Sequence, residues 1–170
     1  MRQRIGVSVI ALLVCLLLSQ DVLAQESKAG MLNAADLKQA VPTNYFFAGR
    51  TAPVQLRNAT GFRVASGKMV LAALVDTSGY ATDIAEKFQG LLITEVKLHM
   101  GEADVAPGAY GFGYGKDGTF RLMNVAGDDL LTTAAQTDEG LAHPVPLKFI
   151  AVRGVFRLYA GKKWVLLKTE

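Results

Sequence analysis

From residue 53 onward the chain is a succession of short β-type segments separated by turn residues, and this pattern constrains the fold more than any other feature. Each segment is rich in aliphatic, β-branched or aromatic residues, which favour strands. Between the segments stand Ala-Thr-Gly, Ser-Gly, Pro-Gly and Asp-Gly sequences or single glycines, which are typical of turns. The sequence therefore predicts strands at 53–58, 62–65, 68–76, 91–99, 109–114, 119–125, 145–153, 155–160 and 163–168.

The connections between these segments favour an antiparallel all-β fold. The last three strands are joined by too few residues for a crossover, so we expect an antiparallel meander. Residues 69–75 (MVLAALV) are continuously apolar, which indicates a strand buried on both faces. Residues 91–100 alternate instead, with the even-numbered residues toward the core and Glu95, Lys97 and His99 on the other face. Together these features predict a small barrel or barrel-like sandwich of about 8–9 strands.

A short helix is expected before the strands. Asn33 is a good N-cap for residues 34–41, and Pro42 would end the helix. Residues 25–32 carry no clear pattern and are expected to form a flexible leader. The sequence thus predicts a single β domain at 33–170.

The first 24 residues have the pattern of a secretory signal peptide. Arg2 and Arg4 precede an apolar run at 5–18, and small residues place cleavage after Ala24. The run is shorter than the about 20 apolar residues of a membrane span. The sequence therefore predicts an exported bacterial protein, periplasmic or extracellular, with no integral membrane segment after cleavage.

Removal of this segment changes the charge and the cysteine content. It takes away Arg2, Arg4 and Asp21, which leaves 16 basic and 14 acidic residues and a net charge of +2. The sole cysteine, Cys15, would also be removed. Disulfides, thiolate catalysis, thiolate zinc sites and iron–sulfur clusters are then excluded. With no basic helix or long basic run, nucleic acid is not an expected partner.

The most distinctive segment is the alternation of aromatic residues and glycine at 107–115 (PGAYGFGYG). In a strand, Tyr110, Phe112 and Tyr114 lie on one face, and the glycines lie on the other. Assuming an even-length hairpin loop, Arg121 and Met123 join the aromatic face, and Phe120 and Leu122 join the glycine face. One interpretation is a core face with glycines that permit close packing. The other is a ligand-binding wall formed by Tyr110, Phe112, Tyr114 and Arg121.

Two polar segments are candidates for chemistry. Residues 126–144 are expected to form a long loop with four carboxylates and His143, and residues 76–89 are expected to form a second one. They lack EF-hand spacing, a nucleophile elbow and a phosphate-binding loop. The sequence predicts no metal site, no cofactor and no catalytic residue, although carboxylates and a histidine brought together by folding would suit a hydrolase.

Five segments together resemble a family of uncharacterised exported bacterial proteins of the acidobacterial type. They are APVQLRN (52–58), LAALVDTSGY (71–80), KFQGLLITE (87–95), PGAYGFGY (107–114) and RLYAG (157–161). The resemblance implies an exported single domain and implies no activity, cofactor or catalytic residue.

Three functional hypotheses follow from these observations. The first is a non-enzymatic protein that binds a small, partly apolar or aromatic-stacking ligand. The second is an interaction or assembly module of the bacterial envelope, which requires an exposed apolar patch or an open strand edge. The third is a hydrolase, which requires the segments 76–89 and 126–144 to meet in one cleft.

Overall fold

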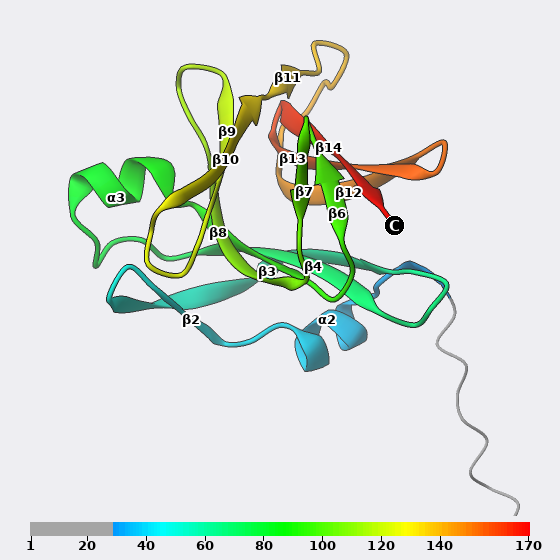
Figure 1. Cartoon of the computed structure of the whole chain (residues 1–170), viewed down its shortest axis with the longest axis horizontal. Helices are drawn as coiled ribbons and strands as arrows, with labels where there is room; N and C mark the ends of the chain where they lie inside the picture. The colour runs from blue at the N-terminus through cyan, green and yellow to red at the C-terminus, as the bar shows by residue number, and fades with distance from the viewer. Residues whose placement is uncertain (1–28) are drawn as a thin grey trace, which may run out of the picture.

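The computed structural model describes residues 29–170, which form two antiparallel sheets packed as a sandwich (Figure 1). The predicted signal peptide and its cleavage site lie outside the described residues. The first sheet contains β1 (Gly30–Met31), β2 (Asn44–Phe47), β3 (Arg50–Arg63), β4 (Met69–Val75), β5 (Gly90–Thr94), β8 (Gly108–Tyr114), β9 (Thr119–Met123) and β10 (Asp129–Ala134). The second contains β6 (Leu98–Met100), β7 (Ala103–Val105), β11 (Gln136–Thr137), β12 (Val145–Val152), β13 (Val155–Gly161) and β14 (Lys163–Thr169). The helices are α2 (Ala34–Ala40) and α3 (Thr82–Lys87).

The order of the strands confirms the antiparallel sandwich, and the sheets do not close into a barrel. The first sheet runs β1-β3-β4-β5-β8-β9-β10, with β2 paired to part of β3. The second runs β12-β13-β14-β6-β7, with β11 paired to β14. The meander predicted for the last three strands is present as β12, β13 and β14.

Two separate layers of apolar side chains lie on the two faces of the first sheet. The inner layer, between the sheets, includes Phe62, Leu92 and Phe112 from the first sheet and Phe149 and Leu158 from the second. The outer layer lies under α2, the β2–β3 hairpin and α3. This arrangement confirms that residues 69–75 are buried on both faces, because alternate residues of β4 enter alternate layers.

Helix α2 has the cap that the sequence predicts. The side chain of Asn33 accepts hydrogen bonds from the backbone N–H groups of Ala35 and Asp36, at 2.8 and 3.0 Å. The Asp36 carboxylate accepts one in return from the backbone N–H of Asn33, which completes a capping box. The helix ends at Ala40, one residue earlier than predicted.

Several predicted boundaries are wrong because strands bend or change sheets. The predicted strands 53–58 and 62–65 form one strand, β3, whose register shifts between Val54 and Ala59. The predicted strand 91–99 is instead β5 and β6, which lie in different sheets. Its alternation is still observed, since each even-numbered residue from Leu92 to Met100 is buried. The alternation of apolar and polar residues predicts which side chains are buried, but it does not predict in which sheet they lie. When the chain passes from one sheet to the facing sheet, the same alternate residues still point into the space between the sheets.

The expected long loop at 126–144 and the expected leader both contain strands. Residues 129–134 and 136–137 form β10 and β11, which leaves a loop at 138–144. At the N-terminal end, Gly30–Met31 forms β1 and pairs with Arg63 and Phe62 of β3. The sequence did not indicate these strands because their side chains are largely exposed at sheet edges. Among residues 29–170, no helix has the length and apolar character needed to cross a membrane.

Candidate functional site

The three rings of β8 lie in the inner layer of the sandwich. Phe112 is fully buried and Tyr114 is 6% exposed, and both rings contact Phe120 at centroid distances of 5.9 and 5.1 Å. The Tyr114 hydroxyl donates a hydrogen bond of 2.6 Å to the carbonyl of Leu158 in the second sheet. Burial raises the pKa of this hydroxyl above its ordinary value. Tyr110 is half-buried, and its hydroxyl donates to the carbonyl of Ala106 at 2.7 Å. The face of β8 that carries the rings is therefore packed against the protein's own side chains.

Arg121 lies on the face of the β8–β9 hairpin opposite the aromatic rings. The prediction that it joins the aromatic face is therefore wrong. Tyr114 pairs with Phe120, and Gly113 pairs with Arg121. The backbone N–H of Gly115 bonds the carbonyl of Thr119, so three residues, 116–118, form the loop. Gly118 has φ +79°, as a three-residue hairpin loop requires. An odd loop length inverts the face of each residue after it, so Phe120 and Leu122 join the rings and Arg121 does not.

The glycine face of β8 is where the covering elements approach the first sheet. A Cβ atom added at Gly113 would lie 2.8 Å from the carbonyl carbon of Lys87, at the end of α3. One added at Gly111 would meet the ring of Phe47, which is itself stacked on Phe88 at 3.9 Å. The glycines therefore permit close packing, as one of the two interpretations of this strand predicted.

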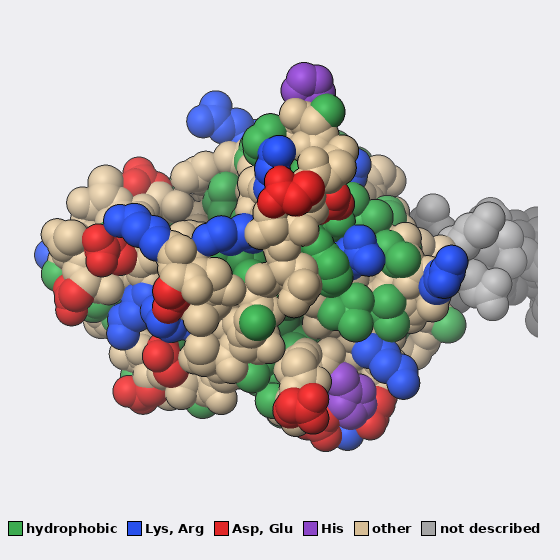
Figure 2. All heavy atoms as spheres, turned by 90° about the horizontal axis from the view of Figure 1, so that it is seen from above, with side chains coloured by type: hydrophobic (Ala, Val, Ile, Leu, Met, Phe, Trp, Pro, Cys, Tyr) green, Lys and Arg blue, Asp and Glu red, His purple; other side chains and the backbone are tan. Residues whose placement is uncertain are grey.

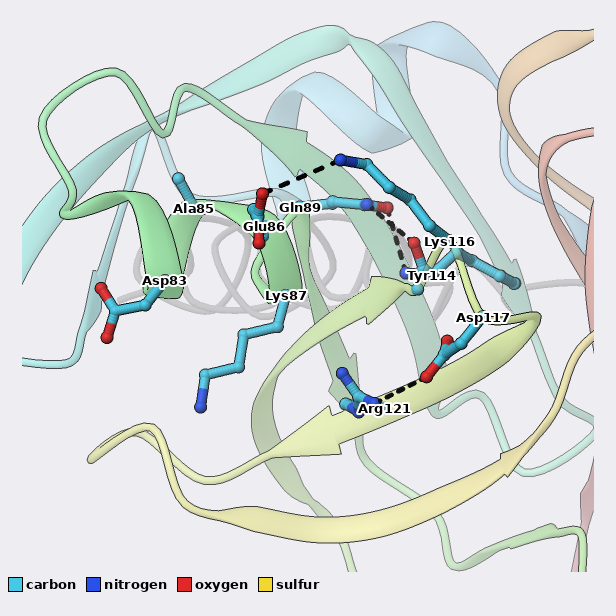
Figure 3. Close-up of a pocket in the computed structure, with 10 residues that line it drawn as sticks. Asp83, Ala85, Glu86, Lys87, Gln89, Tyr114, Lys116, Asp117 and Arg121 are labelled. Atoms are coloured by element: carbon cyan, nitrogen blue, oxygen red, sulfur yellow. Dashed lines mark hydrogen bonds and ion pairs between the residues drawn. The ribbon is translucent and has the colours of Figure 1, made fainter.

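A groove of about 460 Å³ lies between α3 and the β8–β9 hairpin, and Arg121 and the backbone of Tyr114 contribute to it (Figure 3). The side-chain amide of Gln89 bonds the N–H and the carbonyl of Tyr114, at 3.1 and 3.0 Å, and holds the two elements together. The other side chains are mostly charged: Asp83, Glu86, Lys87, Lys116, Asp117 and Arg121.

The charges in this groove largely neutralise one another. Arg121 Nη2 lies 3.0 Å from the carboxylate of Asp117, and Lys116 Nζ lies 3.8 Å from that of Glu86. Hydrogen bonds from the hydroxyl and N–H of Thr119, with the charge of Arg121, lower the pKa of the Asp117 carboxyl. The groove thus has three acidic and three basic side chains, and polar atoms make up about half of its lining.

The groove that Asp83 and Glu86 of the first polar segment line contains no histidine among the described residues. Residues 82–87 form α3 beside the β8–β9 hairpin, whereas the loop 138–144, which contains His143, follows β11 at the top of the view (Figure 1). His99 is part of a separate group on β6, β7 and the C-terminal residue, where it contacts Asp104 and Glu170. Lys97 Nζ lies 3.2 Å from the Asp104 carboxylate and 2.7 Å from the Glu170 carboxylate. Its hydrogen bonds lower the pKa of both carboxyls, and they raise the pKa of Lys97.

Within residues 29–170 no group of three or more potential ligands is arranged to hold a metal ion. The contacts of His99 explain why the group that it forms with Asp104 and Glu170 is not a metal site. Its Nδ1 contacts Asp104 and its Nε2 contacts Glu170, so the two carboxylates lie on different sides of the ring.

A smaller and more apolar hollow lies beside the only tryptophan of the chain, Trp164. Strand β14 pairs with β11 at Lys163 and Trp164 and with β6 at Lys168 and Thr169, so residues 165–167 lack a strand partner on that side. The hollow at this gap has a volume of about 260 Å³. It is lined by Gly101, Thr133, Ala134, Gln136, Trp164, Val165 and Leu166.

Trp164 and Leu166 also belong to the outer face of the second sheet, which Figure 2 shows from above as a cluster of hydrophobic side chains among Lys and Arg. The guanidinium of Arg157 lies over the Trp164 ring, 3.9 Å from its centroid. Its Nη1 donates to the Tyr159 hydroxyl at 3.3 Å, and that hydroxyl donates to Asp138 at 2.9 Å. These residues were not among the site residues predicted from the sequence. The available signal was the presence of Arg157, Lys163 and Lys168 within otherwise strand-forming apolar segments.

No protein-family model, no curated protein and no solved structure matches this chain. The geometry of the described residues therefore carries the functional argument.

Proposed function

We propose that this chain is an exported, non-enzymatic protein that binds a small, partly apolar ligand with an anionic group. The apolar part of the ligand enters the hollow beside Trp164, and the anionic part lies near Arg157 and Lys168. The observation that carries the proposal is this hollow, an apolar recess next to basic side chains on an otherwise regular sheet.

The size of the hollow limits the ligand. Sites for drug-sized ligands occupy about 300–1,000 Å³, and this hollow occupies about 260 Å³. It accommodates a short alkyl chain or one ring, so the polar part of the ligand remains at the surface. Leu166 at its rim is 44% exposed, which leaves the entrance open.

The basic side chains near the hollow favour a ligand whose polar part is anionic. Arg157 pairs with Leu166 across the β13–β14 ladder, and Lys168 is two residues further along the same face of β14. Two acidic groups near the hollow have partners of their own, since Asp138 accepts a hydrogen bond from Tyr159 and Glu170 forms an ion pair with Lys97. A carboxylate, sulfate or phosphate on the ligand would therefore face positive charge.

Fluorescence of Trp164 tests the proposal directly, because this residue is the only tryptophan and lines the hollow. The protein is titrated with octanoate, octanol and octylamine, each below the concentration at which it self-associates. We expect a saturable blue shift with octanoate, a weaker response to octanol and the weakest to octylamine. No saturable response to octanoate, or equal responses to octanoate and octylamine, would contradict the proposal.

Two leucine variants separate the hollow from general surface binding. Leu166→Ser removes an apolar contact at the rim, and we expect it to weaken octanoate binding by several-fold, because each buried methylene contributes about 0.8 kcal/mol. Leu130→Ser is the matched control, since Leu130 is 55% exposed on β10 and does not line the hollow. Equal losses in the two variants would mean that octanoate binds elsewhere.

A further inference from the structure

The C-terminal meander has an excess of basic over acidic residues, whereas residues 25–144 do not. Residues 145–170 contain six Lys and Arg residues and a single acidic residue, Glu170. Residues 25–144 contain more acidic than basic residues. The excess charge of the predicted mature chain therefore comes from β12, β13 and β14, although its net charge is small.

Strand register places this charge on the outer face of the second sheet. Lys148 pairs with Tyr159, which pairs with Trp164, and Ile150 pairs with Arg157, which pairs with Leu166. Residues directly opposite each other in a sheet point to the same face. Phe149, Leu158 and Val165 alternate with them and fill the inner layer. The outer face therefore presents apolar and basic side chains in adjacent rows.

Further basic residues extend this face at its ends. Arg153 lies in the β12–β13 turn, Lys162 lies in the β13–β14 turn, and Lys168 pairs with His99 at the other side of β14. Three acidic groups near the face have partners of their own: Asp138 accepts a hydrogen bond from Tyr159, and Asp104 and Glu170 form ion pairs with Lys97. Within residues 29–170, Lys148, Arg153 and Lys168 are not the partners of these three carboxylates.

This face lacks the helices and the hairpin that cover the corresponding face of the first sheet. It is covered in part, because Tyr159 is buried where its hydroxyl bonds Asp138. Its apolar side chains include Trp164 and Ile150, both half-buried, and Leu166, which is exposed. Tryptophan favours the boundary between lipid and water, where its ring is in an apolar layer and its N–H can meet polar groups. Lysine and arginine can lie along an apolar layer with their charges in the headgroup region.

We propose that the outer face of β12, β13 and β14 is a docking surface for an anionic lipid bilayer. The argument is charge complementarity combined with the apolar rows, since cationic side chains attract anionic headgroups while Trp164, Leu166 and Ile150 enter the interface. A second copy of the chain is disfavoured as the occupant because two such faces would oppose positive charge to positive charge. The inference goes beyond the proposed ligand binding and does not depend on it.

Vesicle binding tests the inference with the processed protein, whose N-terminus is read by mass spectrometry. Vesicles of phosphatidylcholine with one quarter phosphatidylglycerol are compared with vesicles of phosphatidylcholine alone. We expect co-sedimentation with the anionic vesicles, a decrease with added salt, a blue shift of Trp164, and its quenching by brominated lipid. Failure to sediment with anionic vesicles, or equal binding to both vesicle types, would overturn the inference.

Matched charge reversals locate the surface. The double variant Lys148→Glu/Lys168→Glu changes two exposed lysines of the face, and Lys38→Glu/Lys68→Glu changes two exposed lysines elsewhere. At about 1 kcal/mol for each basic residue near an anionic surface, we expect the first pair to weaken binding at least tenfold. The second pair has the same net charge and should weaken it much less. Equal losses, or binding without a response of Trp164, would assign the effect to net charge or to another surface.

Two further outcomes also overturn the inference. Binding of a glutamate-rich peptide by this face, with no binding to vesicles, would identify an acidic protein as the occupant. Dimerisation that buries Trp164 would identify a second copy. Because octanoate binding is measured without vesicles, either proposal can fail while the other stands.

Discussion

The outer faces of the two sheets differ in how far other parts of the chain cover them. The outer face of the first sheet is covered by α2, the β2–β3 hairpin and α3, and its apolar residues form a second buried layer. Within the described residues, the outer face of the second sheet has no helix or hairpin over it and is buried only in part, at Tyr159. It includes the apolar residues Trp164, Leu166 and Ile150. The covered face of the first sheet therefore contributes to stability, and the face of the second sheet is available to a partner.

The difference originates in the strands themselves. Strand β4 is apolar at each of its seven residues, so both of its faces require burial. Strands β12, β13 and β14 place apolar residues toward the inner layer and include Lys148, Arg157 and Lys168 on the outer face. Charged residues are rarely buried fully, so this face remains accessible to solvent or to a partner.

The largest expected effect contrasts one side chain from each outer face. Phe47 is fully buried in the covered layer, and Phe47→Ala should lower the free energy of unfolding by about 3–5 kcal/mol. Leu166 is 44% exposed on the open face, and Leu166→Ala should change it by no more than about 0.5 kcal/mol. Urea denaturation of both variants measures the contrast, and similar losses would contradict it.

The next effect concerns the glycine that lets α3 approach the first sheet. In Gly113→Ala the new methyl group meets the backbone of Lys87, which cannot move as a side-chain end can. We expect a loss of about 1–3 kcal/mol, the usual cost of overpacking. Gly79→Ala is the control, since its Cβ would have only an ordinary contact at 3.7 Å. If thermal unfolding of the two variants is the same, α3 is not held closely to β8.

A smaller effect with the opposite sign is expected at Tyr45 of β2. Its hydroxyl is buried and lacks a hydrogen-bond partner among the described residues, and burial raises its pKa to about 12. Tyr45→Phe should therefore stabilise the protein by about 1 kcal/mol. Tyr114→Phe should destabilise it by a similar amount, because it removes the bond to Leu158. Chemical denaturation distinguishes the signs, and a loss in Tyr45→Phe would show that its hydroxyl is bonded.

The smallest effect is pH-dependent and concerns the ion pairs at the edge of the second sheet. The pKa values of Asp104 and Glu170 are lowered in the folded protein, so folding binds fewer protons and these pairs stabilise it above the ordinary carboxyl values of 3.8 and 4.5. That stability is lost as the pH falls through the lowered values. The raised pKa of Lys97 means that its contribution is lost as the pH rises beyond 10.5.

Lys97→Met should therefore lower stability slightly at neutral pH and leave it unchanged in strong acid. The effect is small because these groups are exposed to solvent. Denaturation curves from pH 2 to pH 8 measure the difference between the two proteins. A difference that persists at the lowest pH would point to packing of the lysine chain.

Much of the fold could be predicted from local patterns. The helix cap at Asn33, the meander at the C-terminal end and the double burial of residues 69–75 each depend on residues close together in the sequence. The strand changes at Glu95–Lys97 and at Ala135 could not, because alternation of burial is the same whether a strand stays in its sheet or enters the facing one.

The candidate site was harder to predict for a related reason. The interpretation of β8 as a ligand-facing wall and the interpretation as a core face require the same pattern, and only the side chains of the second sheet decide between them. One residue of loop length then placed Arg121 on the opposite face from the rings. The hollow beside Trp164 is formed by β14, β10, β11 and the β6–β7 turn, which lie far apart in the sequence.

The amino-acid sequence by itself determined which segments become strands and which of their side chains avoid water, because both follow from local periodicity and turn chemistry. The tertiary structure alone decided that the aromatic–glycine strand packs into the core, that one outer face is covered, and that Trp164 lies beside an open hollow. These outcomes depend on sheet order and on the parity of loops, and a change of one residue in a loop exchanges the faces of a strand without altering its pattern.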